Sequence, residues 1–205
     1  MKALRALVGC ESSGIVREAL RRYGVDAMSC DLKPTEIPGP HYQGDVFDVM
    51  DYPWDIGIFH FPCTNTSVSG ARWFKEKRMD GRQQAGVALF MRGWRASEHV
   101  PKVLFEHPVS VVNTLFREPD QIIQPHQFWH LGEPGKGEVK AICIWTRGLR
   151  KFTPTTPTEP GRHPACWLMG PSDTRAEDRS RTYPGVADAW AKQIVEQFKE
   201  ERMAA

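Results

Sequence analysis

The alternation of strand-like and helical segments constrains the fold of this 205-residue chain more than any other feature of its sequence. Strands are expected at 3–10, 25–32, 54–61, 102–108 and 139–145. Helices are expected at 15–24, within 80–98, and at 186–203. Neighbouring parallel strands need a crossover connection, which a helix usually provides. We therefore predict an α/β fold with a mainly parallel, twisted sheet flanked by helices.

The composition is that of a folded domain. Hydrophobic residues make up 40% of the chain and charged residues 25%, which is near the average for globular proteins. A chain of this length can build one domain with a sizeable core, so we expect residues 1–205 to form a single domain. The formal net charge is only +2, so the binding of a charged partner depends on where the charges lie.

The cysteines and the first residues of the chain predict its compartment. There are five cysteines, an odd number, without CxxC spacing, and the histidines show no metal-ligand spacing. The opening MKALRALVGCESSG lacks the pattern of a secretory leader, and no apolar run approaches the ~18 residues of a transmembrane helix. We expect a reduced, cytoplasmic protein with no disulfide, no metal site and no contact with a membrane.

LVGCESSG, residues 7–14, joins the first predicted strand to the first predicted helix through small residues. Glycines at 9 and 14 let the backbone approach a ligand closely, and a helix N-terminus favours anionic groups. The second predicted strand ends at Asp31, where doubly wound folds hold ribose hydroxyls, and Asp45 is suited to accept from an adenine amino group. The pattern predicts a nucleoside cofactor, with NAD and S-adenosylmethionine both open.

Two more strand ends carry groups suited to catalysis. Pro62 and Cys63 follow the strand at 54–61, and Glu106 lies at the end of the strand at 102–108. Ligands in such sheets bind at the carboxyl ends of the strands, so these side chains are expected to share one cleft. A thiolate can attack an electrophilic carbon, and a buried carboxyl that stays protonated can donate to a ring nitrogen. Read singly, the cysteine and the glutamate are each more typical of an ordinary core or strand-end residue than of a catalytic one.

The stretch 70–102 is basic and aromatic. It holds eight Lys or Arg residues against three acids, interleaved with Trp73, Phe74 and Trp94. Cations between aromatic side chains suit a polyanion that carries stackable bases, although a solvated helix face has a similar composition. The stretch is the candidate for phosphate contacts.

Taken in order, these motifs resemble those of the DNA cytosine-C5 methyltransferases over most of the chain. LVGCESSG matches the strand and glycine turn that open the S-adenosylmethionine site, and Asp31 in MSCDL matches the acid that holds the ribose. Gly44-Asp45 matches the pair at the adenine, and Pro62-Cys63 matches the motif of the nucleophile. Glu106-His107-Pro108-Val109 stands at the Glu-Asn-Val motif, and DRSRTYPGVADAW resembles the last motif, which returns to the cofactor pocket.

The resemblance implies a Rossmann-like methyltransferase fold and assigns roles to residues. Cys63 would be the nucleophile at C6 of cytosine, and Glu106 would hold the base edge. The implied S-adenosylmethionine contacts are Gly9, Cys10, Glu11, Ser12, Ser13, Gly14, Asp31, Leu32, Asp45, Val46 and Pro62. The implied substrate contacts are Thr64, Ser67, Ser69, Arg72, His107 and Lys140. The partner would be DNA, as a flipped base or a single strand, since a duplex hides C6.

The chain also departs from the family pattern. Thr64 stands where the family usually has Gln, and His107-Pro108 replaces Asn-Val. The Gln-x-Arg-x-Arg element is absent in form, and Lys140 is the best substitute. A proline-rich loop region, 146–178, stands in place of a large target-recognition domain, so limited sequence specificity is expected. In this respect the chain is similar to the short, phage-type members, which implies a bacterial or phage-infected host cytoplasm.

Other interpretations stay open at the level of sequence. The same chemistry can act on a free nucleotide or on RNA, or can use a modified S-adenosylmethionine donor. A non-catalytic nucleic-acid-binding or anti-restriction protein on this scaffold is a further alternative, favoured by the departures at 64 and 107–108. An NAD-dependent reductase would leave Pro62-Cys63 unexplained. Oligomeric state and target sequence are not predicted.

Overall fold

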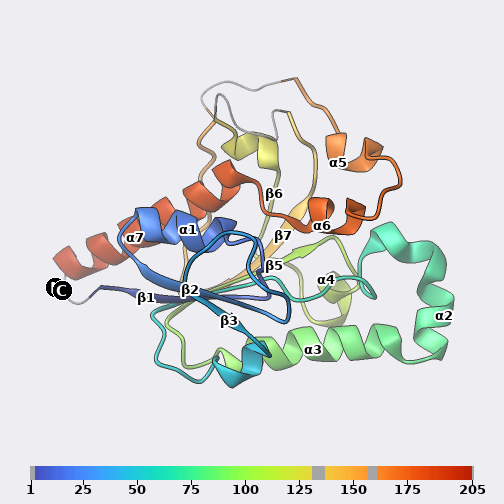
Figure 1. Ribbon diagram of the computed structural model, residues 1–205, viewed down its shortest axis with the longest axis horizontal. Helices are drawn as coiled ribbons and strands as arrows, with labels where there is room; N and C mark the ends of the chain where they lie inside the picture. The colour runs from blue at the N-terminus through green and yellow to red at the C-terminus, as the bar shows by residue number, and fades with distance from the viewer. Residues whose placement is uncertain (1–2, 131–136, 157–160, 205) are drawn as a thin grey trace.

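The computed structural model describes residues 3–130, 137–156 and 161–204. They form a seven-stranded sheet in the order β3-β2-β1-β4-β5-β7-β6, flanked by helices (Figure 1). The strands are β1 (Arg5–Gly9), β2 (Asp26–Asp31), β3 (His41–Gln43), β4 (Ile56–Phe59), β5 (Lys102–Pro108), β6 (Gln121–Ile123) and β7 (Ile142–Arg147). The α-helices are α1 (Ile15–Arg22), α2 (Phe74–Met79), α3 (Arg82–Ala96), α4 (Val112–Leu115), α5 (Ala165–Leu168), α6 (Arg175–Ser180) and α7 (Pro184–Ala204). Three short 3-10 helices are η1 (Val46–Asp48), η2 (Val68–Trp73) and η3 (Pro125–Phe128).

The sheet is mostly parallel, as predicted. Strands β3, β2, β1, β4 and β5 pair in parallel, whereas β7 runs antiparallel to both β5 and β6. The architecture is consistent with a Rossmann-like fold. Strands β2 and β3 are added on one side of β1, and the chain then crosses to the other side of β1 to add β4 and β5. The order reverses between β1 and β4, so the carboxyl ends of these two strands border the crevice where such folds bind ligands.

Both faces of the sheet are covered, so its central strands read as continuous apolar runs. Side chains alternate between the faces: Ala6 and Val8 pack in the core layer that includes Trp190 of α7, while Leu7 packs in the layer that includes Phe90 of α3. Figure 1 shows α1 and α7 on one side of the sheet and α3 on the other. This alternation decides which side chains at the strand ends can meet.

The sequence missed several elements of this fold. The short strands β3 and β6 were not expected, and β3 begins inside the stretch 33–42 that reads as a loop. The segment 146–178 is not simply a proline-rich loop, because its described part includes the end of β7, the helix α5 and the start of α6. Among the described residues, no helix has both the length and the apolar character needed to cross a membrane.

Candidate active site

The turn after β1 is shaped by close packing. A Cβ at Gly9 would lie 2.6 Å from Phe59 Cδ1 and 2.7 Å from Val46 Cγ2, so the position has no room for a side chain. Cys10 follows with a φ of 58°, a left-handed conformation that is uncommon outside glycine. Gly14, with a φ of 73°, ends the turn and begins α1. The turn therefore holds the backbone close to the crevice between β1 and β4, as the sequence predicts.

Glu11 occupies the N-terminus of α1. Its carboxylate is 6% exposed and accepts hydrogen bonds from the backbone N–H groups of Val16 (2.7 Å) and Arg17 (3.4 Å), and from Ser13 Oγ (3.0 Å). A carboxylate at this position satisfies free N–H groups and complements the helix dipole. The amides that would bind an anionic ligand are thus already used within the chain.

Arg17 is a residue of this region that the sequence did not single out. Its side chain is fully buried, and the guanidinium donates to Ser29 Oγ (2.9 Å), Thr35 Oγ1 (3.1 Å) and the carbonyl of Ile37 (2.7 Å). A buried Arg needs such partners because an unpaired charge is costly in the interior. Arg17 thereby holds the loop after β2 against α1. The only sequence signal for this contact was the presence of polar residues in that loop.

The residues expected at a nucleoside lie beside this turn. Asp31 ends β2 and accepts from the backbone N–H of Lys33 at 2.9 Å, and the next residue, Leu32, is 75% exposed. Asp45 is exposed and caps η1 by accepting from Phe47 N at 3.0 Å, while Val46 is buried against Gly9. The carboxylates and an exposed apolar side chain thus lie on consecutive connections at the same edge of the sheet.

Cys63 lies in a tight turn after β4. Its carbonyl accepts hydrogen bonds from the backbone N–H groups of Thr66 (3.0 Å) and Ser67 (2.9 Å) and from Thr66 Oγ1 (3.2 Å). The exposed Thr64 that follows is held through its carbonyl by Lys77 Nζ at 2.5 Å. Pro62 is exposed beside it. The turn therefore presents a half-buried thiol on a well-anchored loop.

Glu106 lies opposite the strand that leads to Cys63. Phe59 pairs with Phe105, so the following residues, His60 and Glu106, are neighbours, and His60 Nδ1 lies 3.2 Å from Glu106 Oε2. Burial acts to raise the pKa of Glu106, but the hydrogen bond and charge of His60, with the charge of Lys140, outweigh it and hold that pKa below its ordinary value. The surroundings of Glu106 thus act against the protonated form that burial alone would favour.

Electrostatics also link Cys63 to the same group. Burial raises the pKa of the Cys63 thiol, and the negative charge of Glu106 raises it further, while Lys140 and Arg179 offset part of the effect. Cys63 is therefore a thiol rather than a thiolate at neutral pH. The sequence motifs at 62–63 and 106 thus lie at the same edge of the sheet, and the charge of Lys140 acts on both Cys63 and Glu106.

Lys140 comes from the segment that enters β7. Its ammonium group donates to the carbonyl of Arg179 at 2.7 Å and lies 5.9 Å from the ring of Tyr183, so it ties this segment to the connection between α6 and α7. The prediction placed Lys140 at the substrate; the structure places its charge near Glu106 and Cys63, with a protein carbonyl as its hydrogen-bond partner.

His107 does not line the site. It is 1% exposed, its Nε2 lies 2.8 Å from Thr66 Oγ1, and its ring packs edge-on against Phe90 of α3. Successive residues of a strand face opposite sides of the sheet, so His107 points away from the side on which Glu106 meets His60. The prediction of a substrate contact is corrected: His107 supports the turn that carries Cys63.

Three other predicted substrate contacts, Ser67, Ser69 and Arg72, lie at the N-cap of η2 or within it. Ser67 is 7% exposed and caps η2 through its hydroxyl, which lies 3.0 Å from Ser69 Oγ. Ser69 and Arg72 are exposed, and the Arg72 guanidinium lies 5.1 Å from the centre of the Trp73 ring. Ser67 is thus structural, whereas Ser69 and Arg72 remain available to a ligand.

Two ion pairs connect α6 and the residue after it to the loop that follows β2. Lys33 pairs with Glu177, and Arg181 pairs with Glu36 at 3.0 Å. All four side chains are partly exposed, so each pair contributes little to stability by itself. Their position matters more, because they place the segment 177–181 beside the loop that follows Asp31.

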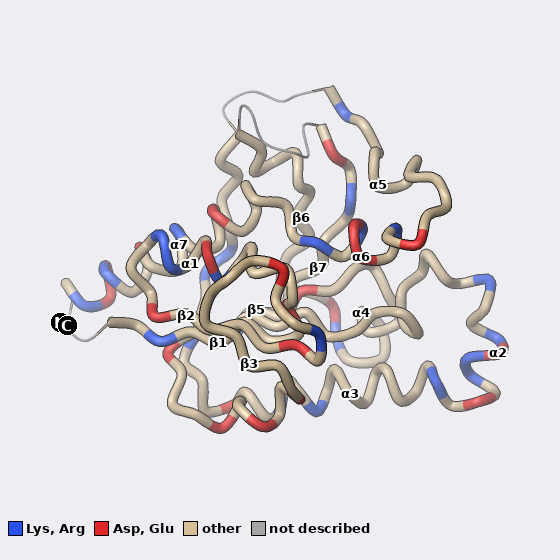
Figure 2. Tube along the Cα trace, in the orientation of Figure 1, with Lys and Arg blue, Asp and Glu red and all other residues tan. Residues whose placement is uncertain are grey.

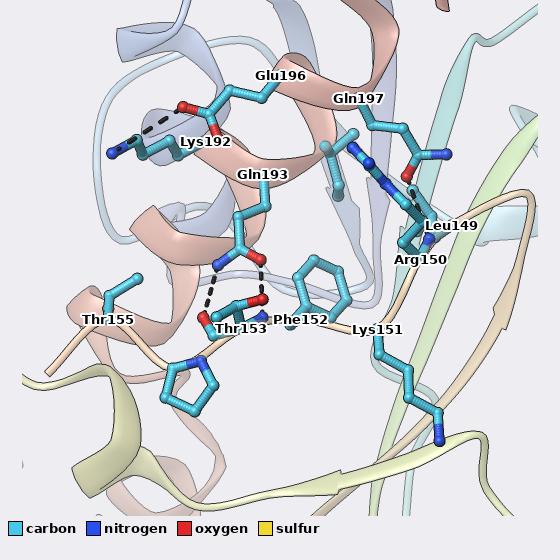
Figure 3. Close-up of a pocket in the computed structure, with 12 residues that line it drawn as sticks. Leu149, Arg150, Lys151, Phe152, Thr153, Thr155, Lys192, Gln193, Glu196 and Gln197 are labelled. Carbon is cyan, nitrogen blue, oxygen red and sulfur yellow. Dashed lines mark hydrogen bonds and ion pairs between the residues drawn. The ribbon is translucent and has the colours of Figure 1, made fainter. Parts of the chain in front are cut away.

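A cavity away from these residues lies between residues 149–155 and α7. It has a volume of about 380 Å³, and Gln193 crosses it with two 2.8 Å hydrogen bonds to the backbone of Thr153 (Figure 3). None of the predicted site residues lines it. Within the described part of the chain, no group of His, Cys, Asp and Glu side chains is arranged to hold a metal ion.

No protein-family model matches the chain, and no curated protein matches it. The arrangement itself offers a thiol, a carboxylate with a histidine behind it, and a lysine charge at the carboxyl ends of β4 and β5. A thiol and a proton-exchanging carboxyl at one crevice are suited to covalent catalysis on an electrophilic ring carbon.

Proposed function

We propose that the protein transfers a methyl group from S-adenosylmethionine to C5 of cytosine in DNA, through a covalent adduct at Cys63. The observation that carries the proposal is that Cys63 follows β4 and Glu106 lies near the end of the neighbouring parallel strand β5, close enough for the charge of Glu106 to raise the pKa of Cys63. That two motifs 43 residues apart in the sequence lie at the same edge of the sheet supports the proposal.

The turn after β1 supports S-adenosylmethionine over a dinucleotide. A pyrophosphate would need the free N–H groups at the N-terminus of α1, which the Glu11 carboxylate already occupies. S-adenosylmethionine has no phosphate, so this cap does not repel it. Asp31 would hold the ribose hydroxyls, Asp45 would face the adenine amino group, and Leu32 would cover the adenine ring. The cofactor supplies the methyl group as an electrophilic carbon.

The chemistry of the chain's own residues follows from their charges. Cys63 passes its proton to solvent water, and the thiolate sulfur bonds to C6 of the cytosine, which breaks the C5–C6 double bond and makes C5 nucleophilic. The ionised Glu106 accepts from the exocyclic amino group of the base. A hydrogen bond from Glu106 to N3 of the cytosine requires a proton on the carboxyl group. The bound cytosine favours protonation of Glu106, because it excludes solvent from the carboxyl group. Loss of the C5 proton then breaks the C6–sulfur bond and releases Cys63.

Covalent trapping tests this function. The protein is incubated with S-adenosylmethionine and with DNA that carries 5-fluorocytosine, as a duplex and as a single strand. After methyl transfer the fluorine at C5 cannot leave as a proton does, so the adduct persists. We expect a stable protein–DNA adduct that maps to Cys63. The Cys63→Ser variant should give none, while Cys166→Ser, which alters a buried cysteine of α5, should still give it.

The main alternative is a protein that binds nucleic acid without catalysis. The raised pKa of Cys63 favours it, because the thiol is not activated in the absence of a ligand. The trapping experiment separates the two: S-adenosylmethionine bound without any adduct on either DNA would contradict the transferase and favour a binding role or another acceptor.

A further inference from the structure

An exposed aromatic and apolar surface follows directly after the Cys63 turn. Val68 and Trp73, in η2, are 47% and 46% exposed, and Met79, at the end of α2, is 80% exposed. By contrast, Trp145 and Trp190 are fully buried. Large apolar side chains gathered at one place on the surface commonly mark a binding site.

Cations lie between these side chains. Arg72 stacks on Trp73, with 5.1 Å from its guanidinium carbon to the ring centre, and Lys75 and Arg78 are exposed on α2. Figure 2 shows Lys and Arg along α2 at the side of the molecule where the parallel strands end. The surface therefore combines stacking area with positive charge, and not apolar area alone.

The surface is fixed relative to Cys63. Lys77, on the same helix, is 7% exposed and donates to the carbonyl of Thr64, so one lysine of the basic stretch anchors α2 to the nucleophile's turn instead of facing solvent. A group bound at Trp73 is thus held at a defined distance from the thiol. Solvated helices with scattered charges lack such an anchor.

Two more exposed apolar side chains lie on α5, on the same side of the molecule as α2. Trp167 and Leu168 are each 69% exposed, and the backbone N–H of Cys166 bonds to the buried carboxylate of Glu138 at 3.1 Å. Glu138 is two residues before Lys140, so α5 is tied to the segment that brings Lys140 to the site. Figure 1 shows α5 and α6 on the same side of the view as α2.

We propose that Trp73, Arg72 and the exposed face of α2 bind an unpaired DNA strand that leads the target cytosine to Cys63, with α5 as the second contact. The inference rests on the proposed function and specifies its substrate as single-stranded. An indole stacks only on a base whose face is free, and bases in a duplex are already stacked and paired. Pulling one base from a duplex costs a few kcal/mol, which a single strand does not require.

Fluorescence anisotropy with labelled 20-mers tests the proposal: a single DNA strand, the matching duplex and the matching RNA strand. We expect the DNA strand to bind at least tenfold more tightly than the duplex. Loss of one stacking contact costs about 1–3 kcal/mol, so Trp73→Ala should weaken binding of the strand about 5- to 150-fold. Tyr52→Ala is the matched control, because Tyr52 is 53% exposed but precedes β4 at the opposite edge of the sheet, and it should leave binding unchanged.

Salt dependence gives a second measurement that does not depend on Trp73. Each phosphate contact of a single strand contributes about 0.7 to the slope of log affinity against log salt, so Arg72→Gln and Lys75→Gln should each lower the slope by about that amount. Lys199→Gln, an exposed lysine near the end of α7, should not change it.

The outcomes separate this inference from the proposed function. Equal or tighter binding of the duplex, or unchanged binding by Trp73→Ala, would overturn the single-stranded substrate even if trapping at Cys63 succeeds. Tighter binding of the RNA strand would overturn the assignment to DNA. Tight, Trp73-dependent binding of the DNA strand without any adduct would support the surface while contradicting the transferase.

Discussion

His60 Nδ1 lies 3.2 Å from Glu106 Oε2, and the two side chains are only 11% and 17% exposed. An ionised carboxylate can only accept, so the hydrogen of this contact is on Nδ1. The His60 ring also stacks at 6.3 Å on Trp190 of α7, which fixes its orientation. His60 is therefore a positioning residue that holds Glu106 and opposes the effect of burial on its pKa.

The first prediction concerns this pair. His60→Ala should raise the pKa of Glu106, because burial would then act without the hydrogen bond and charge that now outweigh it. The shift of the carboxyl carbon in the NMR spectrum, followed against pH, reports this pKa directly. A Glu106→Gln sample identifies the signal. An unchanged titration in His60→Ala would show that Lys140 alone controls the charge of Glu106.

The second prediction concerns the reactivity of Cys63. Because its pKa is raised, the free protein should react slowly with iodoacetamide at pH 7, and the rate at Cys63 should increase steadily as the pH is raised above 9. Mass spectrometry of peptides gives the rate at each cysteine, and Cys63→Ser verifies the assignment. Rapid alkylation at pH 7 would mean that the thiolate forms without substrate, contrary to the arrangement described above.

The third prediction concerns stability and His107. Burial lowers the pKa of His107 from its ordinary 6.5 to about 4. Between these values the unfolded chain binds the proton and the folded chain does not, so stability is complete above pH 6.5 and falls as the pH drops toward 4. The loss from this group is about 3 kcal/mol.

Urea denaturation of the wild type and of His107→Gln at several pH values measures it. Gln does not titrate, so the difference between the two proteins should change across pH 6.5 to 4, with the wild type losing more. Parallel curves over that range would show that His107 is protonated equally in both states.

The fourth prediction concerns the cap of α1. Glu11→Gln removes the charge that complements the helix dipole and weakens the hydrogen bonds to Val16 and Arg17. We expect a loss of about 1–2 kcal/mol in the free energy of unfolding. Glu196→Gln is the control: this exposed acid lies 4.0 Å from Lys192, and such pairs contribute about 0.5 kcal/mol or less. Equal effects of the two substitutions would contradict the capping role.

Much of the site was predictable because strand ends carry local signals. The apolar runs before Gly9, Asp31, Cys63 and Glu106 define strands, and the rule that parallel strands bind ligands at their carboxyl ends brings the four positions to one edge. Strand β6 was missed because only three residues pair with β7, too few for an alternating pattern to stand out.

The positions of His107 and Lys77 could not be predicted for the same reason: a sequence motif does not specify which neighbours a side chain meets in the folded protein. His107 follows Glu106 directly, yet it is buried on the α3 side, which the twofold alternation of a strand implies once Glu106 is placed on the other. Lys77 looks like its exposed neighbours Lys75 and Arg78, and only the tertiary contact with the carbonyl of Thr64 distinguishes it. Local sequence patterns do not predict contacts between segments that are distant in the chain.

The reversal of β7 decides which parts of the chain reach the crevice. Ile142, its first residue, pairs with Pro108, the last residue of β5. If β7 ran parallel to β5, its first residue would lie at the far edge of the sheet, about six residues or 20 Å away. Because the strand enters from the carboxyl edge, Lys140, which precedes it, arrives where its charge acts on Glu106. One inverted strand thus delivers a cation to the edge of the sheet that carries Cys63 without any insertion in the chain.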